Sequence, residues 1–291
     1  MSRRVLIIVN PAAGRAGTSR RRLDRIVAAL ERRGATVVLR RTGPASGDAE
    51  RLARAAEPEF DIIVAAGGDG TLSAVVNGMA AAPRALAVLP LGTANVLACE
   101  IGLPRDPERL AELIATGTAR PIWPGRVGHR LFLTMASTGF DAETVAAVNP
   151  RLKRHLGRLA FVWAILVCLW RYRACELSVR VDDAEHRASA VIAAKGRFYA
   201  GSYVIAPQAD LPEPMLDLAL FQRSGRMAVL RYLCSLLVDR IAQRQDIIFL
   251  RCRDAFVCAA EPLPVQADGE IVGRLPVRLG VAEQPLWLIQ P

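Results

Sequence analysis

Uninterrupted apolar runs and segments of helical periodicity alternate along the first third of the chain. Residues 5–9 and 62–66 are apolar without a break, as strands buried on both faces of a parallel sheet require. Between them, apolar residues recur at i, i+3, i+4 and i+7 and mark one face of a helix: Leu23, Ile26, Val27 and Leu30. The alternation continues with expected strands over 35–40 and 84–92 and expected helices over 48–56, 71–79 and from 93 onward. This order predicts a parallel sheet with helices on both faces.

The pattern changes after about residue 118. The apolar stretches become shorter and are separated by turn residues, which is typical of antiparallel strands. Two helical segments, 151–172 and 226–245, interrupt them, and the second carries an apolar stripe made of Met227, Leu230, Leu233, Leu237 and Ile241. We therefore predict an α/β domain over 1–120 and a mainly antiparallel β domain with two helical segments over 121–291.

The longest apolar run, residues 159–170, has the sequence LAFVWAILVCLW. Twelve residues are too few to cross a bilayer as a helix. The run is typical of a buried helix or of a helix that enters a membrane interface, and we favour burial because most apolar helices are buried.

Composition indicates a globular protein with a strongly basic surface. The chain is 52% hydrophobic and 23% charged, with a formal net charge of +10. Arginine supplies nearly all of the positive charge, because Lys153 and Lys195 are the only lysines. Three partners suit such a surface: nucleic acid, an anionic membrane or a phosphorylated ligand; a basic surface in contact with solvent alone is the alternative. No aromatic residues are interleaved with basic ones as in nucleic-acid-binding patches, so we expect no nucleic-acid partner.

The cysteines and the N-terminal residues indicate the cellular compartment in which we expect the protein. The six cysteines form no C-x-x-C pair and the three histidines are scattered, so no zinc or redox pattern is present. The first fourteen residues lack the apolar core of a signal peptide. We expect reduced thiols in a cytoplasmic protein.

The stretch AAGGDGTLSAVVNG places glycines and one carboxylate at the end of a predicted buried strand. Such a position, at the carboxyl end of a parallel strand and the start of a helix, is where open α/β sheets bind ligands. The N–H groups of the helix start suit phosphate, and glycine allows the backbone to come close. The carboxylate of Asp69 would repel a bare phosphate, so it fits a magnesium–phosphate complex or a role in orienting a hydroxyl or amide. A plain βα turn is the alternative.

Two common nucleotide motifs are excluded. The chain has no G-x-x-x-x-G-K-[ST] phosphate loop. Gly68 and Gly70 begin a G-x-G-x-x-G pattern, but Ser73 takes the place of the third glycine, and the loop follows the third strand rather than the first. These departures argue against a dinucleotide-dependent dehydrogenase. Two further loops, 10–15 and 90–95, are predicted to meet the glycine loop at one sheet edge, and the three together would form a nucleotide-sized polar crevice.

Six motifs together resemble one family. VNPAAG, TGPASGDA, GGDGT, PLGTAN, GFDAETV and ADGE have the order and spacing of the diacylglycerol kinase catalytic-domain family, which includes bacterial lipid kinases and is related to sphingosine and ceramide kinases. The resemblance spans nearly the whole chain. It implies an α/β nucleotide-binding domain followed by a β-sandwich that binds the lipid acceptor, with the active site between them.

The resemblance also implies roles for individual residues. ATP would be bound by Asn10, Pro11, Ala12, Ala13, Gly14, Thr42, Gly67, Gly68, Gly70, Thr71, Leu72, Ser73, Ala74, Thr93 and Asn95. Asp69 would act near the metal–phosphate centre, and Asp268 or Glu270 would be the general base. On the residues alone, ADGE is also typical of a hairpin turn.

A structural Mg²⁺ is implied in the segment APQADLPEPM, with Asp210, Glu213 and the Met215 carbonyl as ligands. The chain departs from the family pattern here, because Gln208 replaces an aspartate, and Pro212 and Pro214 replace an aspartate and a glycine. Ala74 likewise replaces a glutamate in the glycine loop.

The function predicted from these residues is transfer of the γ-phosphate of ATP to a hydroxyl of a membrane lipid, with Mg²⁺, at the inner face of an anionic membrane. The GGDGT motif also occurs in NAD kinases, and the altered metal segment suits a non-catalytic nucleotide-binding regulator, so both stay open as alternatives. The sequence does not fix the acceptor lipid or the oligomeric state, for which a homodimer stays open.

Overall fold

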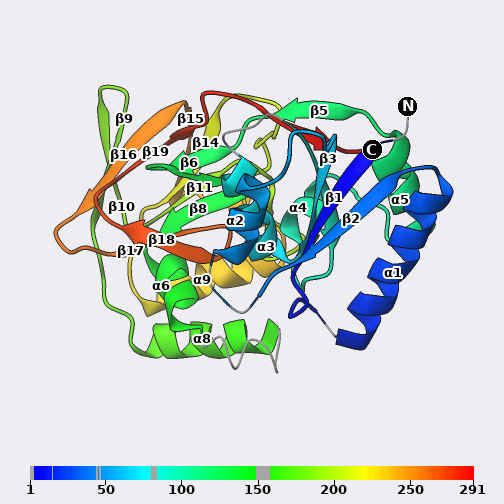
Figure 1. Ribbon diagram of the computed structural model, residues 1–291. Coiled ribbons are helices and arrows are strands. Elements are labelled where there is room, and N and C mark those ends of the chain that lie inside the picture. Colours follow the sequence, from blue (N-terminus) through cyan, green and yellow to red (C-terminus); the bar gives the residue numbers. More distant parts are fainter. Residues whose placement is uncertain (1–2, 15, 44, 46, 80–83, 149–157) are drawn as a thin grey trace. The chain divides into compact units, whose positions relative to one another are not determined.

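In a computed structural model the chain forms two units, residues 1–122 with 284–291, and residues 123–283 (Figure 1). The structure describes residues 3–14, 16–43, 45, 47–79, 84–148 and 158–291. The predicted fold class is confirmed: the first unit contains a mainly parallel sheet with helices, and the second is an antiparallel β-sandwich.

The first unit is built on one six-stranded sheet. Its strand order is β2 (Thr36–Arg41), β1 (Arg4–Val9), β3 (Ile62–Gly67), β4 (Ala85–Pro90), β20 (Leu286–Ile289) and β5 (Ala119–Ile122). Neighbouring strands pair in parallel except β20 and β5, which pair antiparallel. The helices are α1 (Ala16–Arg32), α2 (Asp48–Arg54), α3 (Asp69–Met79), α4 (Val96–Glu100) and α5 (Pro107–Thr116).

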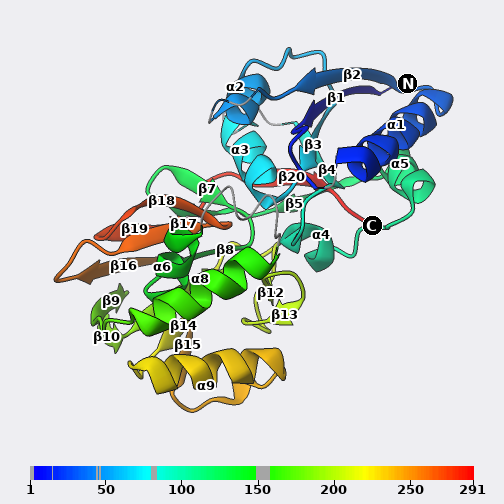
Figure 2. The same ribbon diagram turned by 90° about the horizontal axis from the view of Figure 1, so that it is seen from below.

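Helices cover both faces of this sheet (Figures 1 and 2). Helices α1 and α5 lie on one face, where Ile26 and Leu110 share a buried core with Val5 and Ile7 of β1. Helices α2 and α3 lie on the other face. Because successive residues of a strand point to opposite faces, a strand covered on both sides must be apolar throughout, as the five buried residues from Val5 to Val9 are.

The strand β20 joins the first unit from the far end of the sequence. It pairs in parallel with β4 and antiparallel with β5. The predicted division at residue 120 assigned residues 284–291 to the second domain, whereas the structure places them in the first. The four residues LWLI predict a strand, but a run this short does not indicate which sheet the strand joins.

The second unit contains two six-stranded antiparallel sheets. One has the order β10 (Ala184–Ala188), β9 (Leu177–Val181), β16 (Asp254–Ala259), β19 (Val277–Val281), β6 (Gly125–Val127) and β7 (Arg130–Phe132). The other has the order β15 (Ile247–Cys252), β14 (Leu216–Phe221), β11 (Ala190–Ala194), β8 (Met135–Thr138), β17 (Pro264–Ala267) and β18 (Glu270–Arg274). A separate two-stranded sheet pairs β12 (Phe198–Tyr199) with β13 (Tyr203–Val204). Side chains of both large sheets, among them Val179, Val257 and Leu218, share one buried core, which makes the pair a sandwich.

Helices α6 (Phe140–Ala147), α8 (Arg158–Trp170) and α9 (Arg226–Leu237), with the 3₁₀ turn η1 (Ile241–Gln243), complete the second unit. Helix α9 packs on the outer face of the second sheet through Ala228, Tyr232 and Leu236. The apolar stripe noted in the sequence is not the buried face of the helix, because Met227 and Leu237 are about two-thirds exposed, although Ile241 in the following turn is buried. Apolar residues lie on both sides of this helix, so spacing alone did not identify the buried face.

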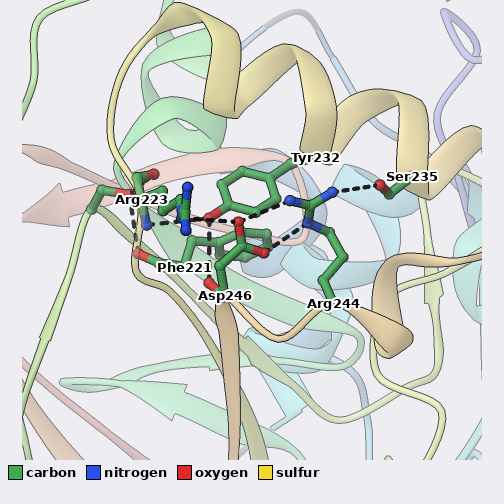
Figure 3. Close-up of polar contacts among 7 residues, drawn as sticks. Phe221, Arg223, Tyr232, Ser235, Arg244 and Asp246 are labelled. Atoms are coloured by element: carbon green, nitrogen blue, oxygen red, sulfur yellow. Dashed lines mark hydrogen bonds and ion pairs between the residues drawn. The ribbon is translucent and has the colours of Figure 1, made fainter.

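An ion pair after η1 fixes this helix to the sheet (Figure 3). The guanidinium of Arg244 donates two hydrogen bonds to Asp246, both 2.8 Å long, and a third to the Ser235 hydroxyl. The Tyr232 ring lies edge-on to Phe221 of β14, with the ring centres 4.9 Å apart, and its hydroxyl accepts the Arg223 N–H. The network joins α9, β14 and the start of β15.

Helix α8 was expected to be buried, and the structure contradicts this. Its residues Ala160, Ala164 and Cys168 are buried, and the helix packs against α6. The opposite side is apolar and exposed, and comprises Leu159, Val162, Trp163, Leu166 and Trp170, of which Trp163 is 60% exposed and Trp170 77%. Most apolar helices are buried, but an apolar sequence does not show whether a second element covers the other side of the helix. Among the described residues, no helix combines the length and apolarity that crossing a membrane requires.

Candidate functional site

The loops after β1, β3 and β4 meet at the carboxyl edge of the first unit's sheet, as the sequence predicted. The side-chain amide of Asn10, after β1, donates to Thr71 Oγ1 in the first turn of α3 at 3.2 Å. The N–H of Leu91, after β4, donates to the carbonyl of Gly67 at 2.8 Å. Thr42, which follows β2, is bonded to the end of β1 through its N–H. The candidate ATP residues are therefore gathered in one place within this unit.

Close backbone contact explains why two of the loop residues are glycines. A Cβ atom at Gly92 would lie 2.4 Å from the Cα of Gly68. A Cβ atom at Gly14 would lie 2.2 Å from the carbonyl oxygen of Leu91, and Gly14 also has a φ of +69°. Neither gap admits a side chain, so the three loops pack backbone against backbone.

Asp69 holds the glycine loop to the loop after β4. One of its carboxylate oxygens accepts the N–H of Asn95 at 3.0 Å, and the other accepts the N–H of Val96 at 2.7 Å. The side chain of Asn95 bonds back to both the N–H and the carbonyl of Gly92. The carboxylate predicted to act near the phosphates thus has a clear structural task, since it orders the backbone of the neighbouring loop.

Accessibility divides the candidate ATP residues. Four are exposed and line the outside of the loops: Pro11, Ala12, Gly14 and Thr93. Seven are half-buried: Asn10, Ala13, Thr42, Gly68, Gly70, Ala74 and Asn95. Gly67, Thr71, Leu72 and Ser73 are buried, and the N–H of Leu72 donates within the helix to Gly68. A ligand at this edge would meet the exposed and half-buried residues first.

In the second unit, Asp268 and Gly269 form the turn of the β17–β18 hairpin. Both have positive φ, +48° and +82°, which is the geometry that an Asp-Gly hairpin turn requires. The Asp268 carboxylate is buried and accepts four hydrogen bonds, from the N–H groups of Leu133, Thr134 and Met135 and from the Thr134 hydroxyl. Burial raises the pKa of Asp268, and these four donors oppose that rise. Both carboxylate oxygens are engaged, so Asp268 orients the turn.

Glu270 is the first residue of β18 and is exposed, two positions after Asp268. Its backbone pairs with Ala267 across the hairpin. Of the two carboxylates in ADGE, Glu270 is therefore the one whose side chain lies on the surface.

A second hydrogen-bond network supports the same turn. The amide of Gln266 donates to the Ser137 hydroxyl at 2.8 Å and to Asp141 at 3.0 Å, and its oxygen accepts the Gly269 N–H. The hydroxyls of Ser137 and Tyr199 also donate to Asp141. Burial raises the pKa of Tyr199, so its hydroxyl stays a proton donor to the carboxylate. Sequence reasoning quoted the motif around Asp141 but assigned it no role; its place in a recurring motif was the available signal.

The segment predicted to hold a structural Mg²⁺ surrounds a lysine. The Lys195 ammonium is buried and donates to the carbonyls of Asp210 (3.0 Å), Met215 (2.9 Å) and Glu213. The Glu213 carboxylate pairs with Arg251. This arrangement does not fit a divalent cation, because an ammonium already occupies the point where the carbonyls converge. Among the described residues, no group of three or more His, Cys, Asp or Glu side chains is placed to hold a metal.

Burial lowers the pKa of Lys195 to about 8, and the carboxylates of Asp217 and Asp210 oppose the shift. The same burial raises the pKa of Asp217. Sequence reasoning missed Lys195, although a lysine at the end of an apolar strand, in a chain with only two lysines, was a usable signal.

Two family profiles cover the chain in succession. Residues 4–127 match the diacylglycerol kinase catalytic domain, and residues 134–290 match the YegS C-terminal NAD kinase beta sandwich-like domain. The boundary between the two matches lies near the start of the second unit.

Individual relatives agree with these profiles over most of their length. A diacylglycerol kinase of Bacillus subtilis is 31% identical over 280 residues, which is 94% of this chain and 92% of the relative. A Pseudomonas aeruginosa protein named "Probable lipid kinase YegS-like" is 33% identical over 252 residues, 84% of this chain and 82% of the relative. The crystal structure of a diacylglycerol kinase from Bacillus anthracis has the same fold, with a TM-score of 0.78 at 24% identity over 99% of this chain and 97% of that one.

Proposed function

Because the chain belongs to the diacylglycerol kinase family and is a lipid kinase, we propose that it transfers the γ-phosphate of ATP to a hydroxyl group of a membrane lipid. The observation that carries the proposal is the meeting of three glycine-containing loops at the carboxyl edge of the parallel sheet, two of them joined by Asp69 and the third by the hydrogen bond from Asn10 to Thr71. Ligands of open α/β sheets bind at such an edge.

The loops supply the groups that bind phosphate. Helix α3 begins at Asp69, so the N–H groups of its first turn and the positive end of its dipole lie among the glycines. The ATP phosphates would lie against Gly68 and Gly70, where the absence of side chains lets them approach the backbone. Mg²⁺ bound with ATP would neutralise charge during transfer, and positioning would supply most of the remaining rate enhancement.

In this proposal Glu270 is the general base. A hydroxyl is a weak nucleophile at neutral pH, and a carboxylate that accepts its proton as it attacks phosphorus removes that obstacle. Asp268 and Asp141 act as positioning residues, because hydrogen bonds within the second unit occupy their oxygens and fix the turn that carries Glu270. Asp69 has the same kind of role among the ATP loops.

The membrane contact is proposed to involve the exposed face of α8. Its two tryptophans and three aliphatic residues form one apolar surface, and aromatic rings of this kind suit the interface between lipid and water. Arg226, at the start of α9, lies over the Trp170 ring and donates to the Trp170 carbonyl at 2.6 Å. A guanidinium beside an apolar helix is suited to a surface of anionic headgroups, because each basic residue near such a surface contributes about 1 kcal/mol of binding. The protein would thus act at the cytoplasmic face of an anionic membrane.

Phosphate transfer from γ-labelled ATP tests the proposal. The acceptors are mixed micelles that contain diacylglycerol or a sphingoid base, and NAD in solution. Glu270→Gln serves as the test variant, and Glu261→Gln, another exposed glutamate of the second unit, serves as the matched control. We expect label in a lipid, its loss in Glu270→Gln and its retention in Glu261→Gln.

Two results would contradict the proposal in different ways. Label in NAD but in no lipid would favour the NAD kinase alternative. ATP binding without transfer to any acceptor would favour the non-catalytic regulator.

A further inference from the structure

The Lys195 ammonium is held by one loop in a way that matches its three N–H groups. Lys195 follows β11, and its Nζ donates to the carbonyls of Asp210, Glu213 and Met215, which all belong to the segment before β14. An ammonium has three donors and no acceptor. Three carbonyls from one short segment therefore satisfy it completely.

Converging carbonyl oxygens are also the ligands that hard divalent cations take in proteins. The residues that offer these carbonyls are the three that the family resemblance assigns to a structural Mg²⁺, where Met215 would bind through the same carbonyl. We propose that the Lys195 ammonium takes the place of this cation, so that the loop over residues 206–216 is ordered by a side chain of the protein and needs no metal. The inference concerns the folded state and does not depend on the proposed reaction.

Charges around the loop agree with a resident monovalent cation. The carboxylate of Asp217 is buried on β14, which pairs with β11 so that Asp217 lies opposite Ala194, the residue before Lys195. Arg251 pairs with Glu213 and lies 3.9 Å from Asp217. The carboxylates of Asp217, Asp210 and Glu213 all attract the Lys195 ammonium, and Arg251 shares two of them, Asp217 and Glu213. A divalent cation added to this group would face two positive side chains.

The changed residues of the segment agree with the same view. Gln208, Pro212 and Pro214 stand where the family pattern has aspartate, aspartate and glycine, so the chain has fewer carboxylates to offer a metal. Lysine also fits the space better than arginine, because an ammonium is a compact point charge and a guanidinium is a broad planar group. This accounts for a buried lysine in a chain whose other basic residues are nearly all arginine.

The loop is connected to the ADGE turn through a single residue. The Thr134 carbonyl accepts the N–H groups of Lys195 (2.8 Å) and Gly196 (3.1 Å), while the Thr134 N–H and hydroxyl donate to Asp268. Thr134 therefore connects the residues around Lys195 directly to the turn that carries Glu270. In this chain Mg²⁺ would be needed with the nucleotide and not for the integrity of the second unit.

Thermal unfolding of the nucleotide-free protein tests the inference, with EDTA, MgCl₂ or CaCl₂ as the only variable. Two variants form a matched pair. Lys195→Ala removes the ammonium and opens its space to a cation, whereas Lys195→Met removes the charge but fills the space. We expect the Tm of the unmodified protein to be the same with EDTA and with either metal.

Both variants should unfold at a lower temperature, by roughly 5–10 °C, since the carbonyls lose their donor. Added Mg²⁺ or Ca²⁺ should raise the Tm of Lys195→Ala and leave that of Lys195→Met unchanged. A Tm of the unmodified protein that falls in EDTA and recovers with Mg²⁺ would overturn the inference. A Lys195→Ala protein that folds but gains nothing from either metal would also overturn it, because the loop would then not be a cation site. If neither variant folds, the EDTA measurement on the unmodified protein decides the question.

Discussion

Thr134 and Asp268 are joined by two hydrogen bonds to the same carboxylate oxygen, one from the Thr134 N–H at 2.9 Å and one from its hydroxyl at 2.6 Å. Thr134 follows directly on Leu133, whose N–H donates to the other oxygen of Asp268. The hairpin turn is thereby fixed to the residues just before β8 by a buried negative charge with four donors. Of the two carboxylates of ADGE, Asp268 therefore holds the turn in place, and Glu270 lies on the surface of that turn.

Replacing Asp268 by asparagine should destabilise the protein as well as inactivate it. The amide would present an NH₂ group to at least one of the four donors and leave a buried N–H without an acceptor, at a cost of about 3 kcal/mol. Chemical denaturation measures the free energy of unfolding. Glu270→Gln is the comparison, because it alters an exposed side chain: its stability should stay within about 0.5 kcal/mol while phosphate transfer falls about a hundredfold or more. Equal stability of the two variants would contradict the assigned roles.

Removing the Asp69 side chain should weaken ATP binding together with stability. In Asp69→Ala the N–H groups of Asn95 and Val96 lose their acceptor, at a cost of about 1–2 kcal/mol, and the loop after β4 is no longer held against the glycine loop. Asp106→Ala is a matched control, because Asp106 caps α5 by accepting the Arg109 N–H in the same unit. Calorimetric titration with ATP should show a loss of affinity for the first variant only. If both variants bound ATP as tightly as the unmodified protein, the loop after β4 would have no part in binding.

The ion pair between Arg244 and Asp246 should stabilise the fold at neutral pH and lose this effect in acid solution. The paired hydrogen bonds from Arg244 lower the pKa of Asp246 in the folded protein. The stabilisation is therefore present above about pH 4, the unfolded pKa of an aspartate, and is lost as the pH falls through the still lower folded pKa. Asp246→Asn should cost about 1–2 kcal/mol at pH 7, and the difference from the unmodified protein should shrink below about pH 4.

The control for this pH effect is Asp254→Asn, which removes an ion pair with Arg278 on the surface, where both side chains are at least half exposed. It should change the unfolding free energy by less than about 0.5 kcal/mol at either pH. Urea denaturation at a series of pH values measures both variants. A constant difference for Asp246→Asn across the acid range would show that its carboxylate charge is not what stabilises the fold.

Binding to anionic vesicles should depend on the tryptophans of α8. Trp163→Ser and Trp170→Ser each remove apolar surface worth about 1.5 kcal/mol or more, so each should weaken binding about tenfold. Trp287→Ser, at an exposed tryptophan of β20, is the control and should bind vesicles as the unmodified protein does. Sedimentation with vesicles of mixed zwitterionic and anionic lipids measures the affinity. Equal losses in all three variants would point to a general effect of the substitutions and not to a membrane face on α8.

The fold of the first unit was predictable because its signals are local and agree with one another. Apolar runs such as residues 62–66 specify strands buried on both faces, and alternation with helices specifies a parallel sheet. Parallel strands then place their carboxyl ends at one edge, which is why the sequence alone predicts that the loops of Asn10, Gly67 and Gly92 meet.

The features that escaped prediction depend on which surfaces meet. Helix α8 has an apolar face on each side, and only the packing of Ala164 and Cys168 shows which one is covered. Helix α9 presents the same difficulty, with Met227 and Leu237 outside and Tyr232 inside. Lys195 belongs to no motif, and its role depends on carbonyls that begin fifteen residues later in the chain. The periodicity of one helix or strand does not show which other part of the chain it packs against.

The strand β20 sets an order for biosynthesis. Residues 286–289 leave the ribosome after the entire second unit, and yet they fill the gap between β4 and β5 in the first unit's sheet. Until they arrive, β4 has an open edge and the sheet is incomplete, whereas the β-sandwich already has all of its strands. The nascent chain is therefore expected to complete the β-sandwich of its second unit before the sheet of its first unit.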